Sequence, residues 1–268
     1  MKKIIIITLV ALTLSLAATS IALALPSNSG INKAGEKSPA IEAGELVAPP
    51  EFTVDLPENQ LTKVVFIRYA PGLEPLCNNN GICEPKENWK SCSSDCTKGG
   101  DSGGDTATAC YGFLSGAKPH WQWVENYYYN DVGLGSTSAW ATNVWNQATG
   151  ATIFGNAVSG AASWGVYDQK NSIVYGNYSE AGVIGVTAIW FQGKNIYEYD
   201  ILFDTDYFPG LGDIDLDSVV LHEFGHGAGL DDLYNSVCAT EVMYGYYDGV
   251  DLDLGPGDLT GIHTLYGN

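Results

Sequence analysis

The chain has 268 residues, which is enough for one good-sized domain with appendages. Its formal net charge is −19. Such a surface repels nucleic acid and anionic lipid, so the composition argues against both as binding partners. The six cysteines are typical of an exported protein whose cysteines pair as disulfides. No feature of the sequence indicates an oligomeric state.

The N-terminus has the pattern of an export signal. Two lysines follow Met1, an apolar run extends from Ile4 to Leu25, and the run ends in the small-residue pattern Ala22-Leu23-Ala24. These features predict a signal peptide over residues 1–24 and a secreted, extracellular protein. The alternative is an uncleaved membrane anchor, because the run is nearly long enough to span a bilayer. Only in that case would the membrane be a partner.

Residues 25–76 are predicted to be a pro-segment or spacer. Their first part is rich in Pro, Gly, Glu and Ser, a composition typical of poorly ordered chain. The later run LTKVVFIRYAPG predicts one short strand that ends at Pro71-Gly72.

Residues 77–96 form a cysteine-rich module, and the Gly/Ser/Asp-rich residues 97–109 form a linker. The module contains Cys77, Cys83, Cys92 and Cys96, and its density predicts a loop-rich fold held by disulfides. Sequence alone leaves fifteen pairings of the six cysteines open. The clustering favours two bridges inside the module and a long-range bridge from Cys110 to Cys238. A zinc knuckle is disfavoured, because paired C-x-x-C spacing is missing.

Residues 110–268 are aromatic and globular in composition. Hydrophobic periodicity predicts four strands here, in WQWVENYYYN, SIVYGNYSE, AGVIGVTAIWF and NIYEYDILFDTD. Three helices are predicted in STSAWATNVWNQATG, LDSVVLHEFGHGAG and LGPGDLTGIHTLYGN. A helix, then strands, then two more helices indicate the α+β class.

The second predicted helix contains a metal-binding pattern. His222 and His226 are four residues apart, so they project from one helix face about one turn apart and can bind one zinc ion. Glu223 lies beside the two ligands, where it can activate a zinc-bound water and pass the proton to the leaving amine. This H-E-x-x-H arrangement predicts a zinc peptidase, with a chance pair of histidines as the alternative.

A third ligand is predicted just beyond the helix. Gly229 can adopt the positive φ that ends a helix and turns the chain sharply. The turn brings Asp232 back toward the histidines, and a carboxylate oxygen is an acceptable zinc ligand. The neighbouring Asp231 could compete for the same role. Three protein ligands leave the fourth position of the metal for water.

The segment HEFGHGAGLDD resembles the extended zinc motif of the metzincins, H-E-x-x-H-x-x-G-x-x-H, with aspartate in the last place. EVMYGYY supplies Met243 where that clan has its Met-turn, and GDLTGIHTLYG is similar to the closing helix of the matrixins. The resemblance implies a matrixin-like catalytic domain over residues 110–268. This domain would have a twisted mixed sheet, an active-site helix, a Met-turn and a C-terminal helix. The resemblance also implies that Asp232 is the third ligand, because its spacing from His226 is that of the family.

The resemblance also implies where substrate binds. In matrixins a strand ahead of the zinc helix binds the substrate backbone along its edge. Val186, Thr187 and Ala188 are therefore expected to pair with an extended peptide. Tyr244 and Tyr246 follow the Met-turn, where matrixins build the pocket after the scissile bond. Ordinary packing is the alternative for these tyrosines.

One departure from the family pattern concerns regulation, and a separate acidic segment concerns metals. The cysteine-switch motif of matrixin pro-segments is absent, and Cys77 in EPLCNNNG is a poor substitute. The carboxylates of DILFDTDYFPGLGDIDLD are compatible with a calcium site. Their spacing is not that of an EF-hand, which favours a solvated acidic loop instead.

The sequence as a whole predicts a secreted zinc metalloendopeptidase that acts on protein or peptide substrates. One alternative is an exported binding or adhesion module in which the metal site is vestigial. Another is a zinc enzyme that hydrolyses something other than protein.

Overall fold

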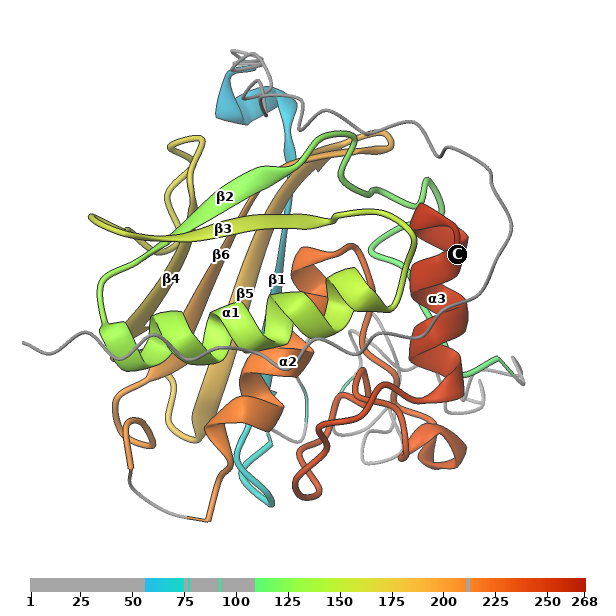
Figure 1. Cartoon of the computed structure of the whole chain (residues 1–268). Coiled ribbons are helices and arrows are strands. Elements are labelled where there is room, and N and C mark those ends of the chain that lie inside the picture. Colours follow the sequence, from blue (N-terminus) through green and yellow to red (C-terminus); the bar gives the residue numbers. More distant parts are fainter. Residues whose placement is uncertain (1–55, 75–76, 78–91, 93–108, 211–212) are drawn as a thin grey trace, which may run out of the picture. The chain divides into compact units, whose positions relative to one another are not determined.

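The computed structural model describes residues 56–74, 77, 92, 109–210 and 213–268 (Figure 1), which belong to one compact unit that begins at Glu51. The predicted signal peptide lies outside the described residues. So do most of the spacer, the cysteine module apart from Cys77 and Cys92, and nearly all of the linker. Within the described part of the chain, no helix is long and apolar enough to cross a membrane.

A six-stranded mixed sheet forms the framework (Figure 1). Its strands lie in the order β1-β5-β6-β4-β2-β3. Strands β2, β3, β4 and β6 run parallel to one another, whereas β5 is antiparallel to β6 and β1 is antiparallel to β5. The bounds are Thr62–Tyr69 for β1, Glu125–Tyr129 for β2, Phe154–Ser159 for β3, Asn171–Gly176 for β4, Val183–Gln192 for β5 and Asn195–Asp204 for β6.

Among the described residues, three α-helices accompany the sheet. Two short 3₁₀ helices, η1 (Glu58–Gln60) and η2 (Ser236–Cys238), lie outside the strands. Helix α1 covers Val132–Gln147, α2 covers Leu216–Gly227 and α3 covers Pro256–Tyr266. The aspartates Asp131 and Asp215 cap α1 and α2, each by accepting a backbone N–H three residues on. Helix α1 therefore begins earlier than its polar stretch predicted, since the cap lies before Val132.

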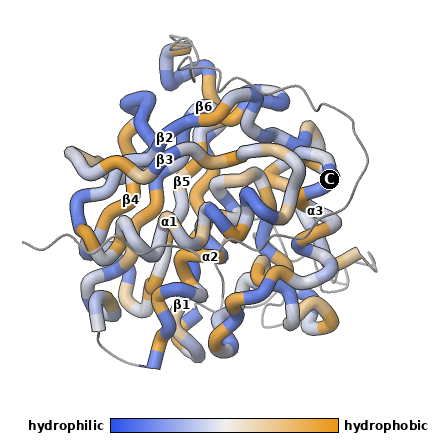
Figure 2. Tube along the Cα trace, in the orientation of Figure 1, coloured by the Kyte–Doolittle hydropathy of each residue, from blue (hydrophilic) through white to orange (hydrophobic). Residues whose placement is uncertain are grey.

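The core lies between the sheet and helices α1 and α2. Figure 2 shows apolar segments along α2 and the central strands. Phe224 of α2 packs edge-to-face against Tyr127 of β2, Phe154 of β3 and Tyr199 of β6. Trp145 of α1 is fully buried, and its indole N–H donates to Leu221 O over 2.9 Å. These contacts fix α2, and with it the zinc motif, against the sheet.

Both faces of the central strand β6 are buried. Its aromatic side chains face the helices, as the alternation in the sequence predicts. On the other face the carboxylates of Glu198 and Asp200 are also fully buried. They accept backbone N–H groups from the 163–172 segment, among them those of Gly165 and Asp168. Burial raises the pKa of Glu198 to about 9 and that of Asp200 to about 8.

The α+β class and the sheet–helix architecture predicted from the sequence are confirmed by these elements. Strand β3 was not predicted, because FGNAVS alternates only weakly and contains a glycine. It forms nevertheless, because it pairs in parallel with β2.

Candidate metal centre

Helix α2 places His222 and His226 side by side in the interior. Both are almost fully buried, and their rings lie 4.7 Å apart, centroid to centroid, at nearly a right angle. His222 Nδ1 donates to Val242 O over 2.7 Å, and His226 Nδ1 donates to Leu230 O over 3.0 Å. Because a carbonyl only accepts, each Nδ1 carries the proton and each Nε2 keeps its lone pair. The two Nε2 atoms are the ones available to bind a metal.

A tight turn after α2 returns the chain to the histidines. Gly229 has φ +106°, and a Cβ there would lie 2.4 Å from Pro119 O, so neither the conformation nor the space admits a side chain. The turn brings Asp232 Oδ1 to 3.2 Å from His222 Nε2 and 3.5 Å from His226 Nε2. Tyr234 donates its hydroxyl to Asp232 Oδ2 over 3.0 Å and so orients the carboxylate.

The adjacent aspartate has a different environment. Asp231 Oδ1 accepts the backbone N–H of Asp232 over 3.0 Å, and its Cβ lies next to Gly112. The structure therefore brings Asp232, and not Asp231, together with the two histidines. Within the described residues, these three are the one group of at least three His, Cys, Asp or Glu side chains that could hold a metal ion.

The donor atoms fit a zinc ion. Among the described residues, His226 Nε2 and Asp232 Oδ1 are buried without a hydrogen-bond partner. Buried polar atoms normally have partners, and a cation bound between these two would provide one for both. Two imidazoles and one carboxylate are a donor set of catalytic zinc sites. Burial by itself would raise the pKa of Asp232, but the neighbouring imidazoles hold it below its usual range, as suits a ligand.

Glu223 is fully buried between α2 and β5. Thr187 donates its hydroxyl to Glu223 Oε2 over 2.5 Å, while Oε1 has no partner among the described residues. A Cβ on Gly185 would lie 2.6 Å from this Oε1, so the glycine leaves room for the carboxylate. Burial raises the pKa of Glu223 to about 6. A carboxylate with one oxygen held and one free is suited to proton transfer.

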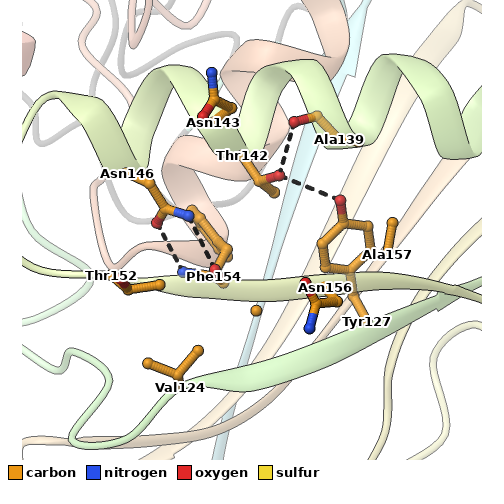
Figure 3. Close-up of a pocket in the computed structure, with 11 residues that line it drawn as sticks. Val124, Tyr127, Ala139, Thr142, Asn143, Asn146, Thr152, Phe154, Asn156 and Ala157 are labelled. Atoms are coloured by element: carbon orange, nitrogen blue, oxygen red, sulfur yellow. Dashed lines mark hydrogen bonds between the residues drawn. The ribbon is translucent and has the colours of Figure 1, made fainter. Parts of the chain in front are cut away.

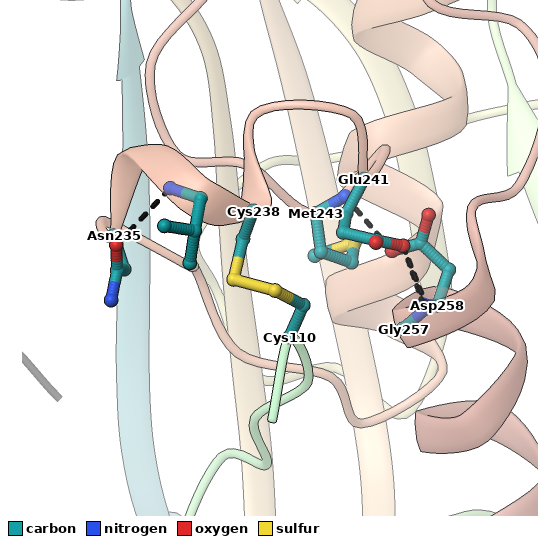
Figure 4. Close-up of a disulfide and its surroundings, with 8 residues drawn as sticks. Cys110, Asn235, Cys238, Glu241, Met243, Gly257 and Asp258 are labelled. Carbon is teal, nitrogen blue, oxygen red and sulfur yellow. Dashed lines mark hydrogen bonds between the residues drawn. A yellow bond between two sulfur atoms is a disulfide. The ribbon is translucent and has the colours of Figure 1, made fainter. Parts of the chain in front are cut away.

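Met243 packs beneath the histidine-bearing helix. It is buried, and its Sδ lies so close to Gly225 that a Cβ at Gly225 would be 2.1 Å away. The following helix fixes this turn, because Asp258 accepts the backbone N–H of Val242 over 2.7 Å. It also accepts the backbone N–H of Met243 over 3.1 Å (Figure 4). Val242 O in turn accepts the hydrogen bond from His222, so the carboxylate of Asp258 indirectly supports a candidate metal ligand.

Asp258 and Glu241 were not predicted from the sequence as supporting residues. Glu241 accepts the backbone N–H groups of Gly257 and Asp258 at the start of α3. The available signal was the GPGD sequence, in which Pro at the first helical turn and Asp at the third position mark a helix N-terminus.

A disulfide joins Cys110 to Cys238, the long-range pairing that the clustering favoured (Figure 4). It ties the start of the domain to the loop between Asp232 and Met243. A second disulfide joins Cys77 to Cys92, so these two cysteines are not zinc ligands, and Cys77 offers no thiolate. Cys83 and Cys96 lie outside the described residues.

The residues predicted to bind substrate lie next to the metal centre. The edge of β5 formed by Val186, Thr187 and Ala188 is paired with Ile67, Phe66 and Val65 of β1. Tyr244 O accepts a hydrogen bond from Arg68 of β1 over 3.0 Å. Tyr246 instead packs its ring against Tyr234 and Tyr244.

Two other features of the described residues, a pocket and an acidic segment, contain no comparable group of catalytic or metal-binding side chains. A pocket between α1 and β3 is lined by 11 residues, none with a charged side chain (Figure 3). Some of its polar side chains bond one another or the backbone: Asn146 bonds the backbone of Phe154, and Thr142 bonds Tyr127. The acidic segment considered for calcium is described except for residues 211–212, and no second metal-binding group is found among its described residues.

Comparison with known families agrees with this geometry. The model of one family, described as matrixin, matches residues 128–267. In chain order, the match spans the sheet from the last residues of β2 onward, α2 with its histidines, the turn at Met243 and all of α3. No curated protein gives a significant match to the chain.

Proposed function

We propose, from the premise that this chain belongs to the matrixin family of zinc-dependent endopeptidases, that His222, His226 and Asp232 bind its zinc and that Glu223 is its general base. The observation that carries the proposal is the convergence of the three donor atoms within 4.8 Å of one another. Buried donors without partners and a free carboxylate oxygen beside them support it.

In this proposal zinc would, when bound, acidify a water molecule and polarise the scissile carbonyl. Glu223 Oε1 takes the proton of the attacking water, and the same carboxyl then delivers it to the leaving amine. Thr187 keeps Glu223 Oε2 occupied, so the proton is carried by Oε1, the oxygen without a partner among the described residues. The backbone carbonyls of Val242 and Leu230 keep both imidazoles in the tautomer that binds metal.

We assign Met243 a packing role beneath the metal site. Its polarisable side chain fills the space against Gly225 and supports the helix without offering a donor to the metal.

We also propose that the protein is exported, with residues 1–24 as its signal peptide. The Cys110–Cys238 and Cys77–Cys92 disulfides support this, because disulfides persist in oxidising compartments outside the cytosol.

Glu223→Gln tests the function directly. The variant should keep zinc, because no ligand is removed, and should lose at least about 10²-fold of its proteolytic rate, because the base is gone. Zinc content by metal analysis and cleavage of unfolded casein provide the two readouts. Turnover near that of the unchanged protein would contradict the role of Glu223.

A further inference from the structure

Strand β1 lies where an extended peptide is expected to bind. It runs antiparallel to β5 and pairs with it from Thr62↔Phe191 to Tyr69↔Val183. Figure 1 shows it at the edge of the sheet, next to β5. Peptides commonly bind proteins by adding a strand to such an exposed sheet edge. The chain therefore fills its own peptide-binding edge, defined here as residues Gly185–Ala188 of β5, with residues of its N-terminal part.

The side chains of β1 that face α2 reach the metal centre. Phe66 is paired with Thr187 and stacks on the His226 ring, with centroids 3.9 Å apart and planes 9° apart. Arg68 is paired with Gly185, the position that borders Glu223. Directly opposed residues of two strands share one face of the sheet. Thus Phe66 and Arg68 both point toward the catalytic groups.

Arg68 is held by the segment after Met243. It is 6% exposed, and its Nη1 donates to Tyr244 O over 3.0 Å. Its Cζ lies 5.8 Å from the centroid of the Tyr247 ring, and Asp215 N–H fixes that ring by donating to its hydroxyl. Burial lowers the pKa of the guanidinium, whereas Glu223 and Asp232 raise it, so the cation has two carboxylates nearby.

The sequence contains a single arginine, and it is this one. Its Nε has no hydrogen-bond partner among the described residues, so the site satisfies the guanidinium only in part. A partly satisfied buried cation is a weaker anchor than a fully bonded one. Such partial bonding of Arg68 is suited to a strand that has to dissociate from the β5 edge.

We propose that β1 is a substrate-like occupant of the peptide-binding edge and that the position of Arg68 is where the protein accepts a basic side chain of its substrates. The proposal rests on the proposed peptidase function. It makes the chain with β1 in place the resting form, and it makes extended peptides with Arg or Lys at this position the preferred substrate class. The net charge of −19 favours the approach of such peptides.

The test uses the zinc-loaded full chain carrying Glu223→Gln, so that peptide binds without being cleaved. A fluorescent peptide of sequence TKVVFIRY, identical to β1, is titrated into this parent and into its Arg68→Ala variant. When β1 occupies the edge in most chains, the apparent affinity for added peptide equals the intrinsic affinity multiplied by the fraction of chains whose edge is free. Arg68→Ala should therefore raise the affinity by roughly tenfold or more. A peptide with leucine in place of arginine should bind this variant roughly tenfold more weakly.

Lys63→Ala is the matched control. It removes a positive charge from the same strand, but Lys63 contacts Gly165 and Trp190, away from the metal centre. This variant should bind the peptide as weakly as the parent does. Hydrogen exchange of the β5 amides gives a second readout, which should rise in Arg68→Ala and stay unchanged in Lys63→Ala. Circular dichroism verifies that both variants are folded.

The outcomes separate the two proposals. If Arg68→Ala leaves both peptide affinity and β5 exchange unchanged, or if the leucine peptide binds as well as the arginine peptide, the present inference is overturned. Activity is then measured in chains that retain Glu223. If Arg68→Ala chains that retain Glu223 show the expected binding pattern but no hydrolysis, the peptidase function is refuted and β1 remains the occupant of the edge.

Discussion

The contact between Met243 and α2 predicts opposite effects for two glycine substitutions on the same helix. A Cβ at Gly225 would lie 2.1 Å from Met243 Sδ and 2.9 Å from Trp145 Cζ2. A Cβ at Gly227 would lie no closer than 3.4 Å to Tyr199, which is ordinary contact. Gly225→Ala should therefore disturb the packing beneath the histidines, whereas Gly227→Ala should fit without rearrangement.

The magnitudes follow from these distances. Replacing a helical glycine by alanine gains up to about 1 kcal/mol in helix propensity, so Gly227→Ala should be neutral or stabilising by that amount. At Gly225 the methionine would have to move by about 1.5 Å to restore normal contact. Trp145 cannot yield, because it is fully buried and bonded to Leu221 O. Overpacking of this kind costs about 1–3 kcal/mol and outweighs the propensity gain.

The assay is thermal unfolding of both variants with zinc present, together with their zinc content. For a domain of this size, 1 kcal/mol corresponds to a shift in Tm of about 2–4 °C. Gly225→Ala should unfold several degrees below Gly227→Ala and bind zinc more weakly. Equal midpoints for Gly225→Ala and Gly227→Ala would refute the reasoning, because Met243 would then not be packed tightly against α2.

Three further predictions concern the ligands, the long disulfide and a buried acid. Asp232→Ala should lose zinc and Asp231→Ala should keep it, as metal analysis will show; the reverse result would contradict the ligand assignment. Because the Cys110–Cys238 bridge spans 128 residues, its replacement by two serines should lower the unfolding free energy by up to about 5 kcal/mol in denaturant titrations. An unchanged midpoint would show that the bridge does not restrain unfolding. Burial raises the pKa of Glu198 to about 9, so between about pH 5 and 9 the folded chain holds a proton that the unfolded chain has lost. The unfolding free energy should therefore fall as pH rises through this range, and Glu198→Gln should flatten the dependence; an equally steep profile would show that another group is responsible.

The part of the site that the sequence predicted is local. His222, Glu223 and His226 are fixed relative to one another by one helix. Asp232 lies three residues beyond Gly229, the glycine at which the chain turns back after this helix. Over such short separations, helix geometry and the positive φ of Gly229 leave little freedom. The structure places the donor atoms together as that geometry requires.

The parts that the sequence did not predict depend on distant segments. Strand β3 owes its conformation to parallel pairing with β2, and Asp258 reaches Val242 from a helix that begins fourteen residues later. Thr187 was expected only as strand backbone, yet its hydroxyl bonds Glu223 across the interface between β5 and α2. Contacts of this kind follow from tertiary packing, which periodicity and spacing do not specify.

The position of β1 also follows from what β5 would be without it. Nine of the ten residues of β5 are buried, so its side chains are suited to a sheet interior. With β1 absent, this apolar strand would present unpaired N–H and C=O groups along its edge, a template for aggregation. A peptidase that binds substrate by strand addition nevertheless needs that edge to be available. Covering it with a strand of the same chain meets the first demand, because the new outer edge carries exposed Lys63 and ends before Pro71. A charged side chain and a nearby proline are devices that discourage further pairing. On the proposed assignment, the eight residues of β1 protect this edge in the resting form, and a substrate binds along the same edge once β1 has left it.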